Sequence, residues 1–367
     1  MPVAFVNPHH DAVSNLFRND DFAAQRAFFA ARPALAPTPL RDLPALAHTL
    51  GITGLAVKDE TARFGLNAFK AVGATYAVQT LRARGDIAPG QTLVCASEGN
   101  HGRAVARAAR EAGCPARVYV AASVAAPRVA AIESEYAEVV RIDGSYDDAV
   151  RVMAQDAVAH GWMVISDTSW QGYEEIPRLI MLGYTRLLDE AESQWGAVPD
   201  VIFVQGGVGG LLAAVASWAD WRYGSARPRI VAVEPMSAAC LQVSAQHGRP
   251  TSLSGPFDTV MGGLRCGEVS TGAFDAVRTL VDGFVAIEDD WALDAIRALA
   301  TPSGADPAIN AGASGAAALG GLLAALGDPQ LADLRARIRL SANSRVLVLV
   351  TEGVTDPEVY ARALARG

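Results

Sequence analysis

The stretch "VIFVQGGVGGLLAAVASW" at residues 201–218 joins a short run of apolar, mostly β-branched residues to an alanine- and leucine-rich run through a string of glycines. A buried strand, a tight turn and a helix in this order form the repeating unit of parallel α/β sheets. Glycine lets backbone N–H groups approach an anion closely, and the start of a helix adds favourable partial charge. The stretch therefore predicts an α/β fold with a phosphate-type site at this turn.

Toward the N-terminus, the same alternation of short apolar runs and amphipathic runs continues. Glycine follows two of the amphipathic runs, at Gly113 and Gly161, as expected just past the end of a helix. We therefore expect strands at 92–97, 117–122, 138–143 and 162–167, and helices at 101–112 and 147–160.

A second series of strands follows a long helix that is predicted at about 175–195. Because 367 residues exceed one ordinary hydrophobic core, the two series predict two lobes with a cleft between them. The expected strands of this series are 200–205, 229–234, 284–289 and 345–350, and the expected helices lie near 209–223, 290–300 and 313–326.

Polar or glycine-rich loops follow four of the predicted strands. They are "SEGNHG" at 97–102, "DTSWQGY" at 167–173, "GGVGG" at 206–210 and "TEGVTDP" at 351–357. Ligands of open α/β sheets bind beyond the carboxyl ends of the strands. The four loops are therefore expected to form one active site.

The overall charge and hydropathy exclude several classes of protein. The formal net charge is −8 and basic residues are not clustered, which argues against nucleic acid as the main partner. No apolar run approaches the roughly 20 residues that span a bilayer. The N-terminal "MPVAFVNPHH" has no basic stretch followed by an apolar core, so no export signal is predicted and a cytoplasmic protein is expected.

The four cysteines, Cys95, Cys114, Cys240 and Cys266, form no C-x-x-C pair and show no metal-ligand spacing. We expect reduced, unreactive thiols and no bound metal, while a link between Cys240 and Cys266 stays open. The histidines His9, His10, His48, His160 and His247 show no constellation and are expected at the surface or in loops.

The glycine string also invites a dinucleotide interpretation, since Glu234 ends the next strand about where a ribose-binding acid is expected. The spacing fails, however, because Gly207-Val208-Gly209 is followed by Gly210 and two leucines, and the third glycine of G-x-G-x-x-G is missing. The string indicates phosphate near a helix start rather than a nicotinamide cofactor. A turn that needs glycines only for its shape is the alternative.

A lysine lies in an apolar helical pattern at "NAFKAVGATYAV", residues 67–78. Phe69, Val72 and Tyr76 recur at helical spacing, and Asn67 is the expected N-cap. Lys70 would then lie in the first turn, where the positive helix end and apolar neighbours are expected to lower its pKa. Such a lysine can form a Schiff base and carry a proton. The alternative is a lysine with a buried stem and a solvated head.

Lys70 in "NAFKAVGA", then "SEGNHG", then a glycine string after a strand resembles the tryptophan-synthase-type (fold type II) pyridoxal-phosphate (PLP) enzymes. The stretch "KDETARFGLNAFKA", with "DTSWQGYEEIP", "DTVMGGLRCGE" and "TEGVTDP", resembles the diaminopropionate ammonia-lyase family in order from about 38 to 357. The resemblance implies an α/β fold of two lobes, each with a mostly parallel sheet flanked by helices. A large PLP-binding domain of residues 1–85 and 196–367 and a small domain of residues 86–195 are expected.

The resemblance also assigns the cofactor contacts. Lys70 would hold PLP covalently, Asn100 would hydrogen-bond the ring hydroxyl, and Thr351 would face the pyridine nitrogen. A neutral partner such as Thr351 would leave that nitrogen unprotonated, which suits β-elimination. The cofactor phosphate would lie on the backbone N–H groups of Gly206, Gly207, Val208, Gly209 and Gly210.

The substrate carboxylate is expected on the 97–101 loop, which includes Ser97, Glu98, Gly99 and His101. His101 is either a polar contact to substrate or a structural residue. Asp167 matches a second acid of the family and would bind the distal amine of the substrate or protonate it on departure.

Two residues depart from the family pattern. Glu98 stands where the family has the aspartate that serves as the base for the D-enantiomer. The extra methylene moves the carboxylate by about 1 Å, and catalytic geometry tolerates little displacement. Glu98 therefore preserves use of D-substrates, changes the preferred substrate, or only lines the pocket. Gln171 replaces a family glutamate, which weakens the case for a cationic substrate side chain.

The expected activity is PLP-dependent β-elimination of 2,3-diaminopropionate to pyruvate and ammonia through aminoacrylate. Lys70 would remove the α-proton of the L-isomer and Glu98 that of the D-isomer. The alternatives are a dehydratase or lyase for another 3-substituted alanine (serine, threonine or a carbamoylated analogue), a silent PLP-binding carrier or regulatory subunit, and a nicotinamide oxidoreductase. A homodimer is expected by resemblance alone.

Overall fold

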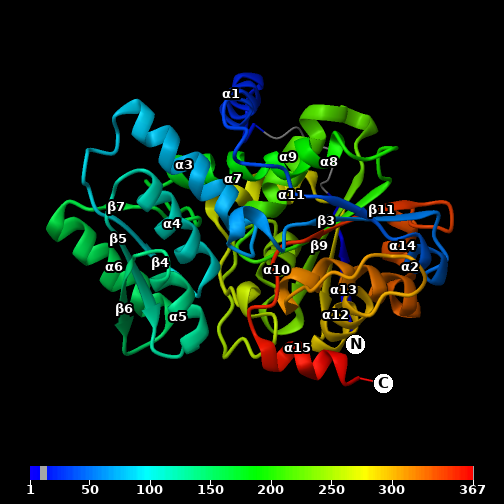
Figure 1. The fold of residues 1–367 in the computed structure, drawn as a ribbon. Helices are drawn as coiled ribbons and strands as arrows, with labels where there is room; N and C mark the ends of the chain where they lie inside the picture. Colours follow the sequence, from blue (N-terminus) through cyan, green and yellow to red (C-terminus); the bar gives the residue numbers. More distant parts are fainter. Residues whose placement is uncertain (9–14, 367) are drawn as a thin grey trace.

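Two β-sheets with helices on their faces organise the chain (Figure 1). The computed structural model describes residues 1–8 and 15–366. The larger sheet has seven strands in the order β1-β10-β9-β8-β11-β3-β2, and the smaller has four in the order β6-β5-β4-β7. The two-lobed α/β architecture implied by the resemblance is confirmed.

The five central strands of the larger sheet, from β10 to β3, run parallel, and the edge strands β1 and β2 run antiparallel to their neighbours. The central strands are buried on both faces, as expected for a parallel sheet covered by helices. Its strands are β1 Val3–Val6, β2 Leu40–Asp42, β3 Gly54–Asp59, β8 Val201–Gln205, β9 Arg229–Pro235, β10 Gly283–Ile287 and β11 Arg345–Val350.

The smaller sheet is entirely parallel. Its strands are β4 Leu93–Ala96, β5 Ala116–Ala121, β6 Glu138–Ile142 and β7 Met163–Val164. They all come from residues 93–164, whereas the larger sheet is built from both ends of the chain. The domain boundaries at 85/86 and 195/196 remain a prediction.

Helices cover both faces of the larger sheet and flank the smaller one (Figure 1). Among the described residues, no helix combines the length and hydropathy that a bilayer-spanning segment requires. The α-helices are α1 Asn19–Ala30, α2 Pro44–Thr49, α3 Lys70–Arg84, α4 Asn100–Glu111, α5 Ala126–Glu133, α6 Tyr146–His160, α7 Glu175–Tyr184, α8 Arg186–Glu192, α9 Gly210–Tyr223, α10 Cys240–His247, α11 Thr271–Leu280, α12 Asp289–Ala300, α13 Ala313–Gly327, α14 Ala332–Arg337 and α15 Pro357–Leu364.

All eight predicted strands exist, but the strand predicted at 162–167 is only two residues long. The single helix predicted at 175–195 is two helices, α7 and α8, which meet at Thr185. The prediction did not include β1, β2 and β3, nor helices such as α10 and α11. Edge strands such as β1 and β2 and short helices carry weak hydrophobic periodicity, so their formation depends on contacts with distant parts of the chain.

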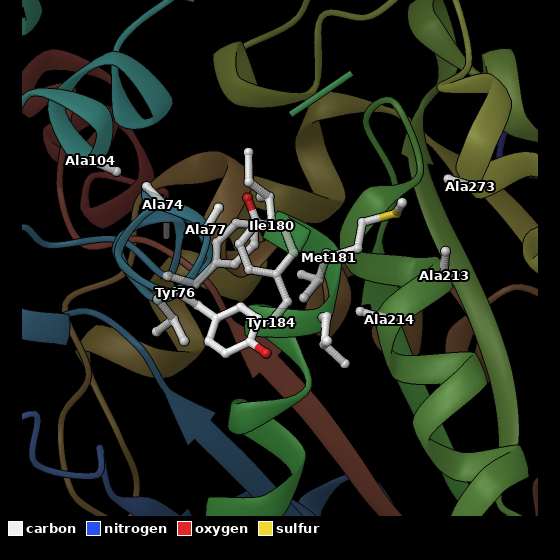
Figure 2. Packing of buried hydrophobic residues seen from close by; sticks show 14 of the residues in the cluster. Ala74, Tyr76, Ala77, Ala104, Ile180, Met181, Tyr184, Ala213, Ala214 and Ala273 are labelled. Atoms are coloured by element: carbon white, nitrogen blue, oxygen red, sulfur yellow. The ribbon is translucent and has the colours of Figure 1, made fainter. Parts of the chain in front are cut away.

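Helix α7 packs between α3 and α9, and this packing fixes the start of α3 (Figure 2). Gly183 of α7 faces Gly73 of α3 so closely that a Cβ on Gly183 would lie 2.8 Å from the Gly73 Cα. The side chains of Ile180, Met181 and Tyr184 fill the space between the helices. Lys70, at the first residue of α3, is therefore held by a rigid helix pair.

Candidate active site

A pocket lies between the two sheets at the carboxyl ends of their strands, as the loop positions predicted. The loops after β4, β8 and β11 and the segment after β7 contribute to its lining. The predicted site residues that line it are Lys70, Ser97, Glu98, Gly99, Asn100, His101, Asp167, Gly207, Val208, Gly209, Gly210 and Thr351. Of the predicted set, Gly206 alone does not line the pocket.

Lys70 is the first residue of α3, and its side chain is 24 % exposed into the pocket. The segment before it is pinned by backbone hydrogen bonds, since Phe69 N–H donates to the Thr351 carbonyl at 3.0 Å and Gly353 N–H donates to the Asn67 carbonyl at 2.8 Å. The prediction that Asn67 caps the helix is wrong. Asn67 has a φ of 59° and lies in the turn before the helix, and Phe69 occupies the N-cap position.

The Lys70 amine faces the Asp167 carboxylate, with Nζ 2.5 Å from Oδ2. Burial alone would lower the pKa of Lys70, but the charge of Asp167 outweighs it and raises that pKa above its ordinary value. The predicted lowering is therefore wrong for the cofactor-free amine. The helix end and the apolar surroundings of Lys70 are outweighed by a carboxylate 97 residues further along the chain.

Asp167 follows β7 and reaches the pocket from the smaller sheet. Burial alone would raise the pKa of Asp167, but the charge and hydrogen bond of the Lys70 ammonium hold it well below its ordinary value. The carboxylate is therefore ionised next to the lysine. Such a pair can hold and pass one proton at the edge of the pocket.

The loop at 97–101 is shaped by the Ser97 hydroxyl, which accepts hydrogen bonds from Gly99 N–H at 3.0 Å and Gly102 N–H at 2.8 Å. Gly99 has a φ of 147°, which an L-residue rarely adopts. Arg128 of α5 donates to the Glu98 carbonyl at 3.1 Å. The half-buried side chain of Glu98, in the loop between β4 and α4, lines the pocket.

His101 is buried, and its Nε2 lies 2.8 Å from the Ile165 carbonyl, so Nε2 carries a proton. Burial lowers the pKa of His101, which favours the neutral ring. Its Nδ1 lies 3.7 Å from the Asp167 carboxylate. His48, His160 and His247 are exposed, as expected, and His9 and His10 lie outside the described residues.

The glycine loop after β8 leads directly into α9, with Gly209 at the N-cap and a φ of 101°. The first N–H groups of a helix have no intrahelical acceptor and can bind an anion. The Gly206 N–H, however, donates to the Val233 carbonyl at 2.7 Å. The prediction that Gly206 binds phosphate through this group is wrong, because the group completes the sheet ladder.

The loop fits a phosphate group because a side chain is excluded at Gly209, where the turn leads into α9. A Cβ on Gly209 would lie 2.9 Å from Leu241, and its φ of 101° is one that L-residues rarely adopt. The residues present thus fit PLP, because Lys70 and the glycine loop line the same pocket. Glu234, the candidate ribose acid, is buried and accepts hydrogen bonds from Leu241 N–H and Gln242 N–H at the start of α10.

All four cysteines are free thiols, so Cys240 and Cys266 are not linked in this structure. Both lie near the glycine loop, and the Cys240 thiol donates to the Gly207 carbonyl at 3.5 Å. Burial raises the pKa of the Cys266 thiol to about 12, which keeps it protonated.

Thr351 is buried next to Gln205, whose Nε2 donates to the Thr351 hydroxyl oxygen at 2.6 Å. Because that oxygen accepts from Gln205, the hydroxyl proton of Thr351 is available for donation elsewhere. A hydroxyl donor suits an unprotonated ring nitrogen, and the role of Thr351 beside that nitrogen stays a prediction.

Several lining residues were missed from the sequence, among them Arg128, Tyr146, Tyr184 and Glu352. Glu352 adjoins the predicted Thr351 and accepts a hydrogen bond from the Asn100 side chain at 2.5 Å. Its place in "TEGVTDP" was the signal that could have found it. Gln171 is exposed and does not line the pocket, so the charge lost at this position does not bear on the substrate side chain.

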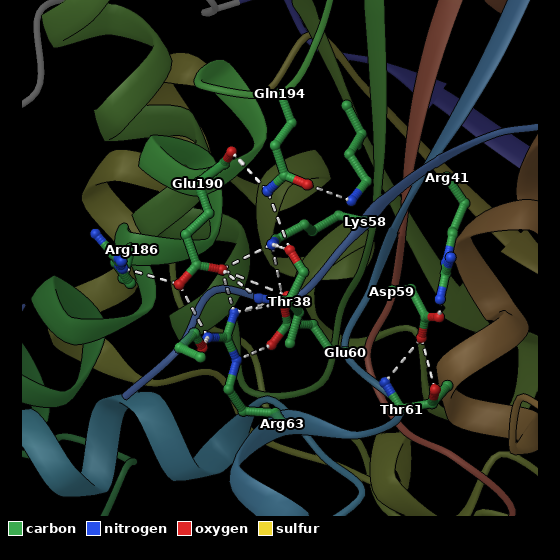
Figure 3. Close-up of polar contacts among 12 residues, drawn as sticks. Thr38, Arg41, Lys58, Asp59, Glu60, Thr61, Arg63, Arg186, Glu190 and Gln194 are labelled. Carbon is green, nitrogen blue, oxygen red and sulfur yellow. Dashed lines mark hydrogen bonds and ion pairs between the residues drawn. The ribbon is translucent and has the colours of Figure 1, made fainter. Parts of the chain in front are cut away.

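A buried ionic network supports the segment that leads to Lys70 (Figure 3). Arg63 donates to Glu60 at 2.6 Å and to Glu190 of α8 at 2.6 Å, and Lys58 donates to Glu190 at 2.7 Å. These four side chains are nearly inaccessible to solvent. The network joins the end of β3 to α8 and so fixes the chain direction before α3.

Comparisons with known proteins agree with the geometry. The family model described as "Pyridoxal-phosphate dependent enzyme" matches residues 31–352. Diaminopropionate ammonia-lyase of Escherichia coli strain K12 is 36% identical over 372 residues, which cover 96% of this chain and 94% of the relative.

Two solved structures of the Escherichia coli lyase are similar over 100% of this chain and 97% of theirs, each with a TM-score of 0.92. One is a complex with an aminoacrylate-PLP azomethine reaction intermediate and is 35% identical, and the other is a complex with D-serine and is 34% identical. The chain belongs to the diaminopropionate ammonia-lyase family of PLP-dependent enzymes.

Proposed function

We propose that this chain is a PLP-dependent lyase that converts 2,3-diaminopropionate to pyruvate and two molecules of ammonia. One observation carries the proposal: the Lys70–Asp167 pair shares a pocket with the glycine loop at the start of α9. The activity of the Escherichia coli relative, as its name states it, supports the same reaction.

PLP bound in this pocket supplies an electron sink for the bond that breaks at the α-carbon. Lys70, Asn100 and Thr351 would hold its reactive aldehyde carbon, ring hydroxyl and ring nitrogen. The N–H groups of Gly207, Val208, Gly209 and Gly210 would hold its phosphate. Gly206 contributes the shape of the turn instead.

The protein side chains then move two protons. The Lys70 amine takes the α-proton of the L-isomer, and the β-carbon–nitrogen bond breaks with its electron pair on the departing nitrogen. That nitrogen needs a proton, because an amide anion is a very poor leaving group, and the Lys70–Asp167 pair supplies it. The aminoacrylate product adds water and gives pyruvate and the second ammonia.

Glu98 would take the α-proton of the D-isomer from the opposite face. Its side chain lines the same pocket as Lys70, which supports this proposal. The retained carboxylate supports continued use of D-substrates over a lining role alone.

Serine is the second candidate substrate, because the Escherichia coli relative forms a complex with D-serine. Hydroxide would leave in place of ammonia and would also require a proton. Pyruvate release from the L- and D-isomers of 2,3-diaminopropionate and serine tests both candidates. A kcat/KM for either diaminopropionate isomer that exceeds both serine values supports the lyase, and the reverse order identifies a serine dehydratase.

Lys70→Ala tests the assignment of the amine. The variant is expected to lose pyruvate release from every substrate, whereas full activity would reject the scheme. Family resemblance also supports a homodimer in the cytoplasm and the division into a large and a small domain, and sedimentation of the purified protein tests the dimer.

A further inference from the structure

Glu352 is a buried acid in the pocket to which no step above assigns a role. It follows β11 and is 3 % exposed. Its Oε2 lies 2.5 Å from the Nδ2 of Asn100, the first residue of α4. A short hydrogen bond to a charged acceptor is stronger than a neutral one. The contact joins the last strand of the larger sheet to the first helix of the smaller one.

The backbone around Glu352 is fixed from two sides. Glu352 forms a bridge with Ala68, two residues before Lys70, and its carbonyl accepts a hydrogen bond from Gly312 N–H at 3.1 Å. The neighbouring Thr351 carbonyl holds Phe69 N–H. The segment that positions the Lys70 helix therefore also carries the carboxylate that holds Asn100.

The side chain lies in a niche that glycine makes possible. A Cβ on Gly312 would lie 2.9 Å from the Glu352 Oε1, and a Cβ on Gly315 would meet the Glu352 backbone. Little space is left for the carboxylate to turn away from Asn100, so its direction is set by the surrounding backbone.

A carboxylate can only accept hydrogen bonds, and a carboxamide presents a carbonyl oxygen on one side and two N–H donors on the other. The Glu352 contact therefore fixes the Asn100 amide in one of its two orientations. One N–H is held by Glu352, which leaves the second N–H as the donor for another partner. A neutral partner such as glutamine would permit either orientation of the Asn100 amide.

We propose that Glu352 is a positioning residue that fixes the Asn100 amide so that its free N–H donates to the cofactor ring oxygen. The negative charge of Glu352 also polarises the amide and strengthens the second hydrogen bond. This inference rests on the proposed function, because it takes Asn100 as the contact to the ring hydroxyl.

Glu352→Gln tests the proposal, because it keeps the size of the side chain and removes its negative charge. The new carboxamide can donate as well as accept hydrogen bonds, so it no longer selects one orientation of Asn100. The readout is the dissociation constant of PLP, measured by titration of the cofactor-free protein in the native and the Asn100→Ala backgrounds. Glu135→Gln is the matched control, since Glu135 is also 3 % exposed and also binds α4, through Arg107, but does not contact Asn100. Thermal melting of each cofactor-free variant checks that it is folded.

The expected result is a loss of about tenfold in PLP affinity for Glu352→Gln in the native background. In the Asn100→Ala background the same change is expected to cost less than about twofold, because the residue it acts through is gone. The absorption maximum of bound PLP is expected to shift in Glu352→Gln and to stay unchanged in Glu135→Gln.

Equal losses in both backgrounds, no loss at all, or an equal loss in Glu135→Gln would each overturn the positioning role. A wrong proposed function would give a different result, because the native protein itself would then bind no PLP. If only the role of Glu352 is wrong, native PLP binding and lyase activity stay intact.

Discussion

The Lys70 ammonium and the Asp167 carboxylate lie 2.5 Å apart, at the start of α3, which packs on α4 and α7, and in the segment after β7 of the smaller sheet. The pair holds a proton in the pocket that the glycine loop also lines. Burial and ion pairing oppose each other at Lys70, and the pairing prevails.

Asp167→Asn is expected to lower the pKa of the Lys70 amine, because the charge that raises it is removed while its burial remains. Acetylation of the cofactor-free protein at pH 8, followed by peptide mass spectrometry, measures this directly. We expect modification of Lys70 to be at least about tenfold faster, the factor that one pKa unit provides. An unchanged rate, equal to that of the exposed control Asp275→Asn, would show that Asp167 does not set the lysine pKa.

Glu98→Gln is expected to reduce kcat/KM for D-2,3-diaminopropionate by about 10²-fold, the usual contribution of one general base. The value for the L-isomer should change by less than about threefold, since Lys70 serves that face. Glu98→Asp, which restores the residue of the family pattern, is the control and should retain activity on the D-isomer. Equal losses for both isomers in Glu98→Gln would refute the opposite-face role.

Gly209→Ala is expected to lower both the melting temperature and the affinity for PLP. Gly209 has a φ of 101°, and an added Cβ would lie 2.9 Å from Leu241, so the turn that presents the N–H groups must shift. Gly196→Ala is the matched control because nothing lies within 4 Å of its added Cβ. Were the two variants to bind PLP equally well, the glycine loop would not be the phosphate site.

Glu190→Gln is expected to destabilise the protein at pH 7 by about 3–5 kcal/mol, because Lys58 and Arg63 lose a buried counter-charge. Burial alone would raise the pKa of Glu190, but the hydrogen bonds and charges of Arg63 and Lys58 lower it from 4.5 to about 2. Because the pKa of Glu190 is lower in the folded than in the unfolded state, its ionised form stabilises the fold at every pH above the unfolded-state pKa. This contribution is lost as the pH falls from about 5 toward 2.

Urea unfolding of the native protein and Glu190→Gln at several pH values measures this dependence. The difference in the free energy of unfolding between the two should be largest near neutral pH and shrink below pH 4.5. A difference that stays constant between pH 7 and pH 3 would show that ionised Glu190 does not stabilise the fold.

The sequence predicted most of the parallel strands because buried parallel strands form continuous apolar runs bounded by glycine and polar loops. It did not predict the edge strands β1 and β2, whose pairing with distant strands leaves little local pattern, nor the central strand β3. The break between α7 and α8 at Thr185 was also missed, although Gly183 lies two residues before it.

The pocket was predictable where polar loops follow predicted strands, as for Asn100 and Asp167, and Lys70 was singled out as a lysine in an apolar helical pattern. The Lys70 pKa and the Glu352–Asn100 contact were not predictable, because both depend on side chains that meet only after the two lobes form. Gly206 shows a related limit. A glycine string does not reveal which N–H group the sheet uses for its own ladder.

The central claim is that the Lys70 amine holds PLP covalently. The sequence contains two lysines, and the other, Lys58, is 1 % exposed in the buried network, so a covalent label is readily assigned. Purified protein should be reduced with borohydride and digested, and its peptides analysed by mass spectrometry. We predict a phosphopyridoxyl group on the peptide that contains Lys70; a label elsewhere, or none on a protein that carries stoichiometric PLP, would contradict the account.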